Sequence, residues 1–381
     1  MKILHVCESL VGGPASYFEE VIPFQVSEFG RDAVIVLVPR QHRSALGASV
    51  DCRIETFNRS GRNLSSFFEL WKQFRKTTKT FVPDIVHLHG TFSGVIGRLA
   101  TAFLRNRPKI VYCAHCWSFD RSDVRLRHKA FEWIERYLAP FTDMLISISP
   151  HEITLLQERN IKFKHNELVV SGIRDDISHC TDVVETESDA TSQLKLLFIG
   201  RFDEQKGLDL LFREFEALPP GRVSLAVVGA KVLPGGNTEF PRDVVMHGWV
   251  PRDRLSDLIA QADAVIMPSR WEGMPLVALE VLRAGRPILA SNIGPFPHIL
   301  TDEVNGVLMN ICAKGFLKNA LDRLENLDLR RMKIEARKAY EQKFNGNRMN
   351  YELLSSYKII ARPKLGSRGS EMNKGAASIQ G

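Results

Sequence analysis

Short apolar runs in the first half of the chain alternate with stretches in which apolar residues recur at helical spacing. The runs predict strands at residues 2–7, 33–38, 84–89, 109–114, 144–149 and 168–170. The helical spacing predicts helices at residues 15–29, 64–80, 94–104 and 123–137. Strands that alternate with helices form parallel sheets covered on both faces. The first half is therefore expected to be a doubly wound α/β domain.

The second half repeats the pattern. Strands are predicted at residues 194–199, 224–228, 244–247, 264–267 and 287–290. We therefore expect two Rossmann-like domains, residues 1–178 and 194–340, joined by a polar and acidic connection over 179–193. A helical pattern over roughly 330–360 breaks at Asn345-Gly346-Asn347, so that 341–361 form a last helix. Residues 362–381 are rich in Gly, Ser and Lys and are expected to be a disordered basic tail.

Composition and charge restrict the class of protein only moderately. The 381 residues are 44% hydrophobic and 25% charged, as in ordinary soluble proteins. A net charge of +7 favours anionic partners, either phosphate groups or an acidic membrane surface, without choosing between them. No apolar run reaches the ~18 residues of a membrane span, and the first residues lack the pattern of a signal peptide. We expect a cytoplasmic protein.

The cysteines and acidic residues give little support to a metal or redox centre. Six cysteines are too sparse for a disulfide framework in a chain of this length. Cys113 and Cys116 form a C-x-x-C fragment, but no second pair has zinc-site spacing. The chain also lacks an Asp-x-Asp triplet that would hold a divalent ion against a sugar diphosphate. No metal or other cofactor is expected.

The most informative local pattern is R-W-E-G-M-P-L-V-A-L-E over residues 270–280. It follows a short apolar strand and predicts a turn and then a helix, with Pro275 in the first helical turn, where its missing N–H costs little. Unpaired amides at such a helix start can face an anion. Glu272 lies in the turn and Glu280 about two turns along the helix, so each carboxylate can meet one end of a sugar linked to a diphosphate. The alternative for Glu280 is a solvated helix residue.

A second pattern supports the same kind of ligand. An apolar strand ends at Gly200 and is followed by Arg201, Lys206 and an amphipathic helix from about Leu208. Two cations near a helix start can neutralise a diphosphate, although a solvated basic turn has the same letters. Ligands in open parallel sheets lie beyond the carboxyl ends of the strands, where Gly229 and Val250 are also predicted.

The first domain offers backbone and histidine candidates. Gly12 and Gly13 follow the first strand, where bare backbone can approach a ligand. A G-x-G-x-x-G pattern is absent, which disfavours a nicotinamide site. His115 ends a strand at the predicted cleft edge, while His87 and His89 share one strand face and are interpreted as mainly structural. The basic amphipathic stretch 121–140 fits a membrane-surface helix or an ordinary surface helix.

Over about residues 1–360 the chain resembles the retaining glycosyltransferases of family 4, which have the GT-B fold with two domains facing across a cleft and a last helix returning to the first domain. Their hallmark, two glutamates separated by seven residues, matches Glu272 and Glu280. The resemblance implies that Glu272 contacts the transferred sugar and Glu280 the ribose. It implies diphosphate contacts from the second domain and the first-domain glycine loop, given by Arg201, Lys206, Gly273, Met274, Pro275, Leu276, Gly12 and Gly13. It also places His115 close to the reacting sugar.

The implied reaction moves a hexosyl group from a nucleoside diphosphate sugar to an acceptor hydroxyl with retention of configuration. Many relatives act on lipid-linked acceptors, so we expect a lipid-linked oligosaccharide in bacterial surface polysaccharide assembly and a possible peripheral contact with the inner face of the plasma membrane. A nucleic acid partner is not expected. The alternatives are a nucleotide-sugar epimerase or a phosphorylase on the same fold, or a relative without catalytic activity.

Overall fold

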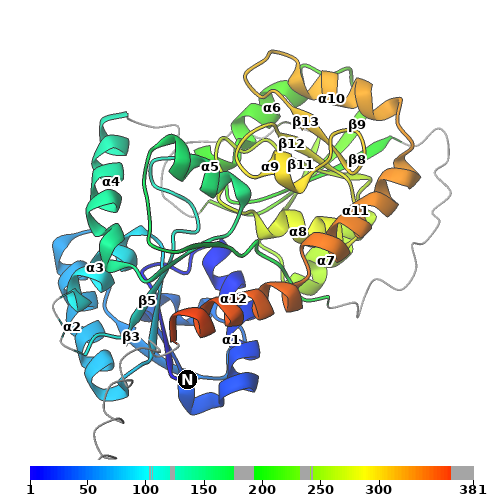
Figure 1. The fold of residues 1–381 in the computed structure, drawn as a ribbon. Coiled ribbons are helices and arrows are strands. Elements are labelled where there is room, and N and C mark those ends of the chain that lie inside the picture. Colours follow the sequence, from blue (N-terminus) through cyan, green and yellow to red (C-terminus); the bar gives the residue numbers. More distant parts are fainter. Residues whose placement is uncertain are drawn as a thin grey trace, which may run out of the picture.

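The structure is a computed structural model that describes residues 1–102, 104, 106–120, 125–175, 193–231, 241 and 243–361. The chain forms two α/β lobes, shown in Figure 1 with the first lobe in blue to green and the second in green to orange. The tail 362–381 and nearly all of the connection predicted over 179–193 lie outside the described residues.

The first domain is built on a parallel sheet of seven strands in the order β3-β2-β1-β4-β5-β6-β7. The strands are β1 (Ile3–Cys7), β2 (Val34–Pro39), β3 (Arg53–Phe57), β4 (Ile85–His89), β5 (Lys109–Cys113), β6 (Met144–Ser147) and β7 (Asn166–Leu168). β3 was not predicted, because its Arg53 and Glu55 are polar residues that an edge strand tolerates. β7 begins two residues earlier than predicted, because it is a short, polar edge strand.

Helices cover both faces of this sheet. They are α1 (Gly13–Phe29), α2 (Leu64–Phe81), α3 (Thr91–Thr101), α4 (Arg125–Leu138) and α5 (Pro150–Glu158). Side-chain caps set two of the starts: Asn63 accepts a hydrogen bond from the Ser66 amide, and Ser149 accepts one from the Glu152 amide. The buried face that includes α2 is a separate apolar cluster with Leu70, Phe74 and Ile110.

The second domain has a parallel sheet of six strands in the order β10-β9-β8-β11-β12-β13. The strands are β8 (Leu194–Ile199), β9 (Val223–Val228), β10 (Val244–Gly248), β11 (Ala264–Met267), β12 (Ile288–Ser291) and β13 (Gly306–Met309). The helices are α6 (Leu208–Glu216), α7 (Arg252–Gln261), α8 (Leu276–Arg283), α9 (Phe296–Ile299), α10 (Phe316–Glu325) and α11 (Leu329–Lys343). Short 3₁₀ segments lie in the first domain at Arg31–Ala33, Arg40–Ala45 and Ala139–Phe141, and in the second domain at Glu204–Lys206.

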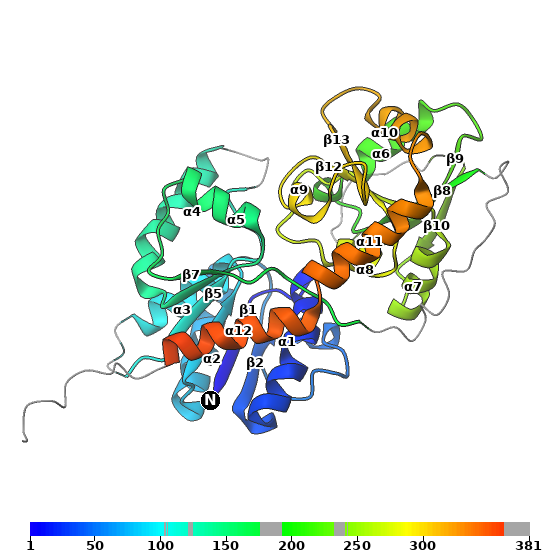
Figure 2. The ribbon, with the colours of Figure 1, turned by 45° about the vertical axis from the view of Figure 1, so that its right-hand side comes forward.

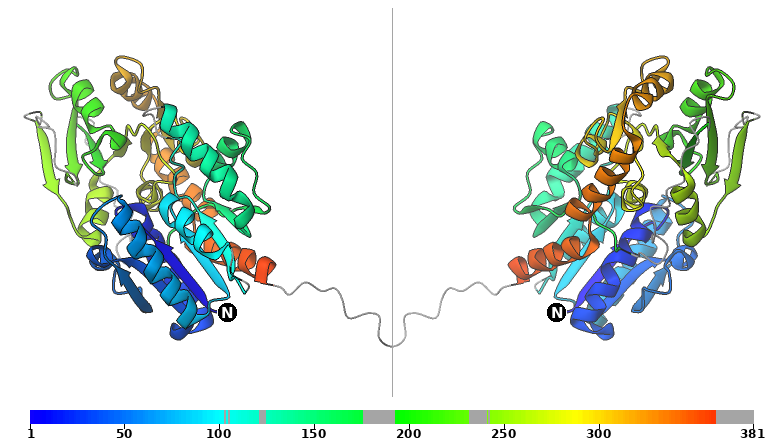
Figure 3. Two further views of the ribbon diagram at one scale, coloured as in Figure 1. Left: turned by 90° about the vertical axis from the view of Figure 1, so that its left-hand side faces the viewer. Right: turned by 90° about the vertical axis from the view of Figure 1, so that its right-hand side faces the viewer.

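The last helix, α12 (Gly346–Ala361), leaves the second domain and packs against α1 of the first. Figure 2 and both views of Figure 3 show α11 leading into α12 along this path. At the junction the Gly346 amide donates to the carbonyl of Ile173 at 2.7 Å, and a Cβ at Gly346 would lie 2.8 Å from the Ile173 carbonyl carbon. A break is thus present close to the predicted Asn345-Gly346-Asn347, and glycine is required at 346 by close backbone contact. The last helix begins at Gly346 and not at residue 341, because residues 341–343 belong to α11.

Both domains contribute to one continuous apolar core. Ile3 and Val36 of the first sheet belong to the same buried cluster as Leu197 and Val265 of the second, together with Tyr357 of α12. A cavity of about 390 Å³ lies at the domain boundary and is lined by both domains. Within the described residues, no helix combines the length and the hydropathy needed to cross a bilayer.

Candidate active site

The loop after β11 carries the first predicted carboxylate. Glu272 is 5% exposed, and helix α8 begins only at Leu276, with Pro275 as its N-cap. Glu280 is the fifth residue of α8 and lies little more than one turn along the helix. The expectation of two turns was wrong, and the two carboxylates are linked by an extended loop.

The carboxylate of Glu272 is held by three side chains. Lys206 Nζ lies 2.6 Å from Oε1, and the Ser269 hydroxyl donates to the same oxygen at 2.9 Å. The Gln205 amide lies 3.4 Å from Oε2. Lys206 and Glu272, which are 66 positions apart in the sequence, thus form an ion pair. Buried charges are generally paired in this way, because an unpaired buried charge is costly. Lys206 and Glu272 were expected to bind different parts of the ligand, and their contact with each other was not predicted.

Arg201, the second predicted cation, also has partners within the site. Its guanidinium lies 3.0 Å from Asp203 Oδ2 and donates to Gln205 Oε1 at 2.8 Å. The four charges of Arg201, Lys206, Asp203 and Glu272 cancel, so an anionic ligand that binds the two cations must displace the carboxylates from them. Sequence reasoning missed Asp203, Gln205 and Ser269. The position of Asp203, three residues before Lys206, is a helix-cap spacing that could have indicated its role.

A bidentate ion pair fixes the loop after β11 against the segment that follows β8. Arg270 binds Asp209 through contacts of 2.8 and 2.6 Å and donates to the carbonyl of Glu204 at 2.7 Å. The hydrogen bonds from Arg270 lower the pKa of the Asp209 carboxyl. Gly207 has a φ of 68°, and a Cβ there would lie 2.0 Å from the carbonyl oxygen of Pro268. The close approach of the two loops therefore requires glycine.

Glu280 differs from Glu272 because its carboxylate forms no hydrogen bond or ion pair with any other described residue. Burial raises the pKa of its carboxyl despite the nearby cations Arg252 and Arg283. Arg252 instead contacts Glu19 of α1, at 2.7 Å across the domain boundary. A desolvated carboxylate without a protein partner can accept hydrogen bonds from ligand hydroxyls. The geometry is compatible with the predicted ribose contact, which stays a prediction.

The predicted glycines fall into two groups. Gly12 and Gly13 are exposed at the start of α1, and a Cβ at either would meet no atom within 4 Å, so their backbone is accessible to a ligand. Gly229 is buried, and a Cβ there would lie 1.8 Å from the Gly200 carbonyl oxygen. Glycine is needed at this position because the ends of β8 and β9 pack closely together. Val250 is half-buried at the end of the β10 loop.

His115 lies where the two domains meet. It has a φ of 61°, which is uncommon for a bulky residue and concentrates at functional sites. A Cβ added to Gly273 would lie 1.8 Å from the His115 carbonyl oxygen, so the Glu272 loop rests directly on this segment. Burial lowers the pKa of the His115 ring to about 4, which makes it neutral at neutral pH. The structure thus brings His115 beside the loop of Met274 and Leu276.

Two doubly wound domains, a returning helix and a charged site at the carboxyl ends of the second sheet define a protein of the GT-B type. The Glycosyltransferase Family 4 model matches residues 11–176, and the Glycosyl transferases group 1 model matches residues 185–341. Sucrose-phosphate synthase from Thermosynechococcus elongatus superposes with a TM-score of 0.82 at 17% identity, covering 94% of this chain and 99% of that structure.

Two curated relatives extend the comparison. An "uncharacterized 41.2 kDa protein in cps region" of Klebsiella pneumoniae is 30% identical over 319 residues, which cover 81% of this chain and 86% of the relative. The UDP-Gal:alpha-D-GlcNAc-diphosphoundecaprenol alpha-1,3-galactosyltransferase of Escherichia coli is 24% identical over 284 residues, 69% of this chain and 70% of the relative. The chain belongs to the family 4 glycosyltransferases and is a glycosyltransferase with the GT-B fold.

Proposed function

We propose that this glycosyltransferase moves a hexosyl group from a nucleoside diphosphate hexose to an acceptor hydroxyl, with retention of the anomeric configuration. The observation that carries the proposal is the pairing of Lys206 with Glu272 at 2.6 Å beside Arg201. A diphosphate offers the cations a better partner than these carboxylates, and a sugar offers Glu272 hydroxyl donors in return. The site is therefore suited to an exchange of ion pairs when the donor binds.

In this proposal the donor diphosphate takes Lys206 and Arg201 as its ligands. Glu272 is then released to accept hydrogen bonds from hydroxyls of the transferred sugar, still held in place by the Ser269 hydroxyl. Glu280 receives the ribose hydroxyls. The two cations and the free amides before α8 stabilise the charge that develops on the leaving diphosphate.

Retention follows if the acceptor attacks on the face that the diphosphate leaves. The bond between the anomeric carbon and the phosphate oxygen breaks, and a bond from the acceptor oxygen forms on the same face. The acceptor proton passes to the leaving phosphate oxygen, so that the products are the glycoside and the nucleoside diphosphate. The protein contributes positioning and electrostatic stabilisation, and no covalent nucleophile is assigned.

We propose a uridine diphosphate hexose as the donor, because the Escherichia coli relative is named for UDP-Gal. Gly229 and Val250 would then border the base. A cation pair in place of a metal is proposed to neutralise the diphosphate, so turnover is expected to persist in excess chelator. Complete loss with restoration by magnesium or manganese would contradict this part of the proposal.

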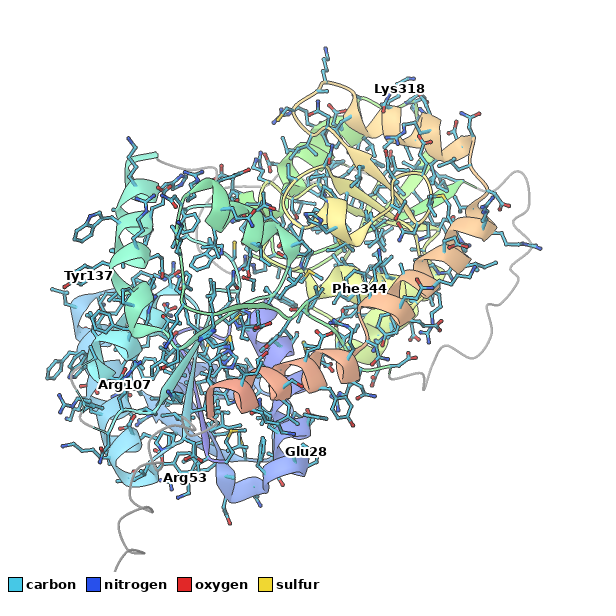
Figure 4. All side chains as sticks on the ribbon, in the orientation of Figure 1. Glu28, Arg53, Arg107, Tyr137, Lys318 and Phe344 are labelled. Carbon is cyan, nitrogen blue, oxygen red and sulfur yellow. The ribbon has the colours of Figure 1, made fainter. Side chains whose placement is uncertain are left out.

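The proposed acceptor is a lipid-linked saccharide of bacterial surface polysaccharide assembly, reached at the cytoplasmic face of the membrane. The same relative is named for a diphosphoundecaprenol acceptor. Helix α4 exposes 65% of Trp133 and 61% of Tyr137, whose rings stack with centroids 5.7 Å apart. Figure 4 shows Tyr137 on the outer side of α4. Exposed aromatic rings beside basic residues suit the interface of an anionic bilayer.

Product analysis tests the reaction. The protein is incubated with a panel of nucleoside diphosphate hexoses, with and without lipid-linked acceptor, and the products are identified by NMR. Release of nucleoside diphosphate with an α-linked product from an α-linked donor supports the proposal. An epimerised donor, a sugar phosphate formed only with added phosphate, or no turnover of any donor would each support one of the alternatives instead.

Vesicle sedimentation tests the membrane contact. Binding to vesicles that contain about one third phosphatidylglycerol should fall clearly in the Trp133→Ala Tyr137→Ala variant. Tyr351→Ala, which removes another exposed ring on α12, is the matched control and should bind as the parent protein does. Equal binding by all three proteins would remove α4 from the proposed contact.

A further inference from the structure

A chain of buried hydrogen bonds runs from α12 to His115. His115 Nε2 lies 2.9 Å from His89 Nδ1, and His89 Nε2 lies 2.9 Å from His5 Nδ1. His5 Nε2 lies 2.7 Å from Gln25 Oε1. The Gln25 amide nitrogen lies 3.4 Å from the Tyr357 hydroxyl, which is 2.6 Å from His87 Nδ1. Side chains from β1, β4, α1 and α12 thus form one connected network, which we call the histidine relay.

The direction of each hydrogen bond between Gln25 and His115 follows from the Gln25 amide. Gln25 Oε1 can only accept, so His5 must carry its proton on Nε2. His5 Nδ1 is then an acceptor, which requires the His89 proton on Nε2. His89 Nδ1 is an acceptor in turn, which requires the His115 proton on Nε2. Each ring has one proton, and the position of each proton fixes the next.

The rings have only one proton to place because they are neutral. Burial lowers the pKa of His5 and His115 to about 4 and that of His87 and His89 well below the usual value. His5, His87 and His89 are each at most 1% exposed. A second proton on any of these rings would place a charge in the apolar core.

We propose that the histidine relay holds His115 in the tautomer with its proton on Nε2, so that Nδ1 offers a lone pair to a hydroxyl of the bound sugar. His115 is half-buried, and no other described residue forms a hydrogen bond to its Nδ1. In this arrangement His89, His5 and Gln25 are positioning residues that act through His115. The tautomer rests on the relay alone, and its consequence for a sugar rests on the proposed function.

His5, His87 and His89 also form the one group within the described residues that could hold a metal ion. Two observations favour the relay. His5 Nδ1 and His89 Nε2 are 2.9 Å apart, closer than the ~3.3 Å between two nitrogens on a tetrahedral zinc with bonds of about 2.0–2.1 Å. Each of these two rings also has its other nitrogen hydrogen-bonded, to Gln25 or to His115.

The relay passes Tyr357 and ends at His87. The Gln25 amide donates to the Tyr357 hydroxyl, which lies 2.6 Å from His87 Nδ1, and His87 Nε2 has no partner among the described residues. His87 is thus outside the path from Gln25 to His115. It lies on the same face of β4 as His89, two residues away, and is equally buried. This makes His87 a matched control for His89.

The tautomer can be read directly by NMR. Long-range ¹H–¹⁵N spectra of the full-length protein, labelled with ¹⁵N-histidine, distinguish a proton on Nε2 from one on Nδ1. The His115 signals are assigned by their loss in His115→Gln. We expect the Nε2–H tautomer at neutral pH. A proton on Nδ1, or an equal mixture of both tautomers, would overturn the proposal.

Variants test the path of the relay. His89→Phe should shift His115 toward a mixture of tautomers, whereas His87→Phe should leave its spectrum unchanged. Gln25 lies two hydrogen bonds further from His115 than His89 does, and Gln25→Leu should also produce the mixture of tautomers. This variant provides the test if His89→Phe does not fold. An effect of His87→Phe as large as that of His89→Phe would show that core packing, and not the relay, sets the tautomer.

A kinetic measurement tests the consequence. In His89→Phe, turnover of a UDP-hexose should fall about 5- to 20-fold, as for the loss of a hydrogen bond to the sugar, while the affinity for UDP alone stays within about twofold. Equal losses of turnover and UDP affinity would contradict a sugar-specific role. If the parent protein turns over no donor, the proposed function fails, and the tautomer measurements still decide the relay.

Discussion

The second-domain loops and the first-domain interior meet at the same boundary but handle polar groups in opposite ways. Around Glu272 the protein uses full charges, and the side chains of Lys206 and Arg201 remain 20% and 25% exposed. Around His89 it uses neutral rings that are almost completely buried and linked in one direction. At the Glu272 site the two cations lie where water and a ligand can reach them, and around His89 the neutral donors and acceptors lie where water cannot.

The difference has a functional meaning. Ion pairs at a partly exposed site can be exchanged for pairs with a ligand at modest cost, because water solvates the charges during the exchange. A buried neutral network cannot be rearranged without leaving a donor or acceptor unpaired. The second domain is therefore suited to capturing and releasing a charged donor, and the first to presenting one fixed hydrogen-bonding group. The following four predictions test this division.

The largest expected effect comes from Gly273, where the two regions touch. In Gly273→Ala the added Cβ would lie 1.8 Å from the His115 carbonyl oxygen, so the loop and the His115 segment must move apart. A displacement of about 1 Å between catalytic groups can cost roughly 100-fold in turnover. We expect at least this loss in donor turnover, with unchanged circular dichroism. Full activity would mean that the contact between the two regions is not needed for catalysis.

Next in size are the effects of removing the exchangeable cations. Lys206→Ala and Arg201→Ala should each weaken nucleoside diphosphate binding by about 1.5–3 kcal/mol, as for charged hydrogen bonds. The protein should remain folded, because Ser269 and Gln205 still bind Glu272 in the Lys206 variant. Lys195→Ala, at the opposite end of β8, is the control and should bind normally. Calorimetry that finds parent-like affinity in both variants would remove the proposed diphosphate site.

The two carboxylates should separate sugar recognition from nucleotide recognition. Glu272→Gln should impair sugar transfer but leave the affinity for bare nucleoside diphosphate nearly intact. Glu280→Gln should weaken the bare nucleotide and the nucleotide sugar alike, since both contain the ribose. Each affected affinity is expected to change roughly tenfold. The assignment is wrong if both variants lose affinity for both ligands equally, or if Glu280→Gln spares the bare nucleotide.

The smallest expected effect concerns the stability of the protein measured without added ligand. Burial raises the pKa of Glu280 in the folded state above its unfolded value, so the carboxyl binds its proton more tightly when folded. Its ionisation therefore costs stability as the pH rises from the usual glutamate range through the raised pKa. Glu280→Gln removes this cost and should raise Tm by roughly 2 °C at neutral pH. The gain should vanish in acid, and a Tm below that of the parent at neutral pH would contradict the assigned shift.

Much of the fold could be predicted because its central strands are apolar on both faces and its helices are amphipathic. β8 and β11 were predicted to the residue for this reason. β3 was missed because it is half polar and lies at a sheet edge, where the need for apolar side chains is weaker. β13 was also missed, although its four residues are apolar and mostly buried. The predicted break before α12 was confirmed, while its close contact with Ile173 could not be inferred from spacing.

The sequence alone determined the residue types and local geometry of the site: a glycine turn between two carboxylates, and two cations after a strand. Such features depend on neighbours in the chain, so spacing reveals them. The tertiary structure alone decided which charges pair, since Lys206 meets Glu272 only when β8 and β11 lie side by side. It also decided that His5, His89 and His115 share one line of hydrogen bonds, because parallel strands bring distant residues into register. Electrostatic and hydrogen-bonding partners depend on distances in space, which sequence separation does not measure.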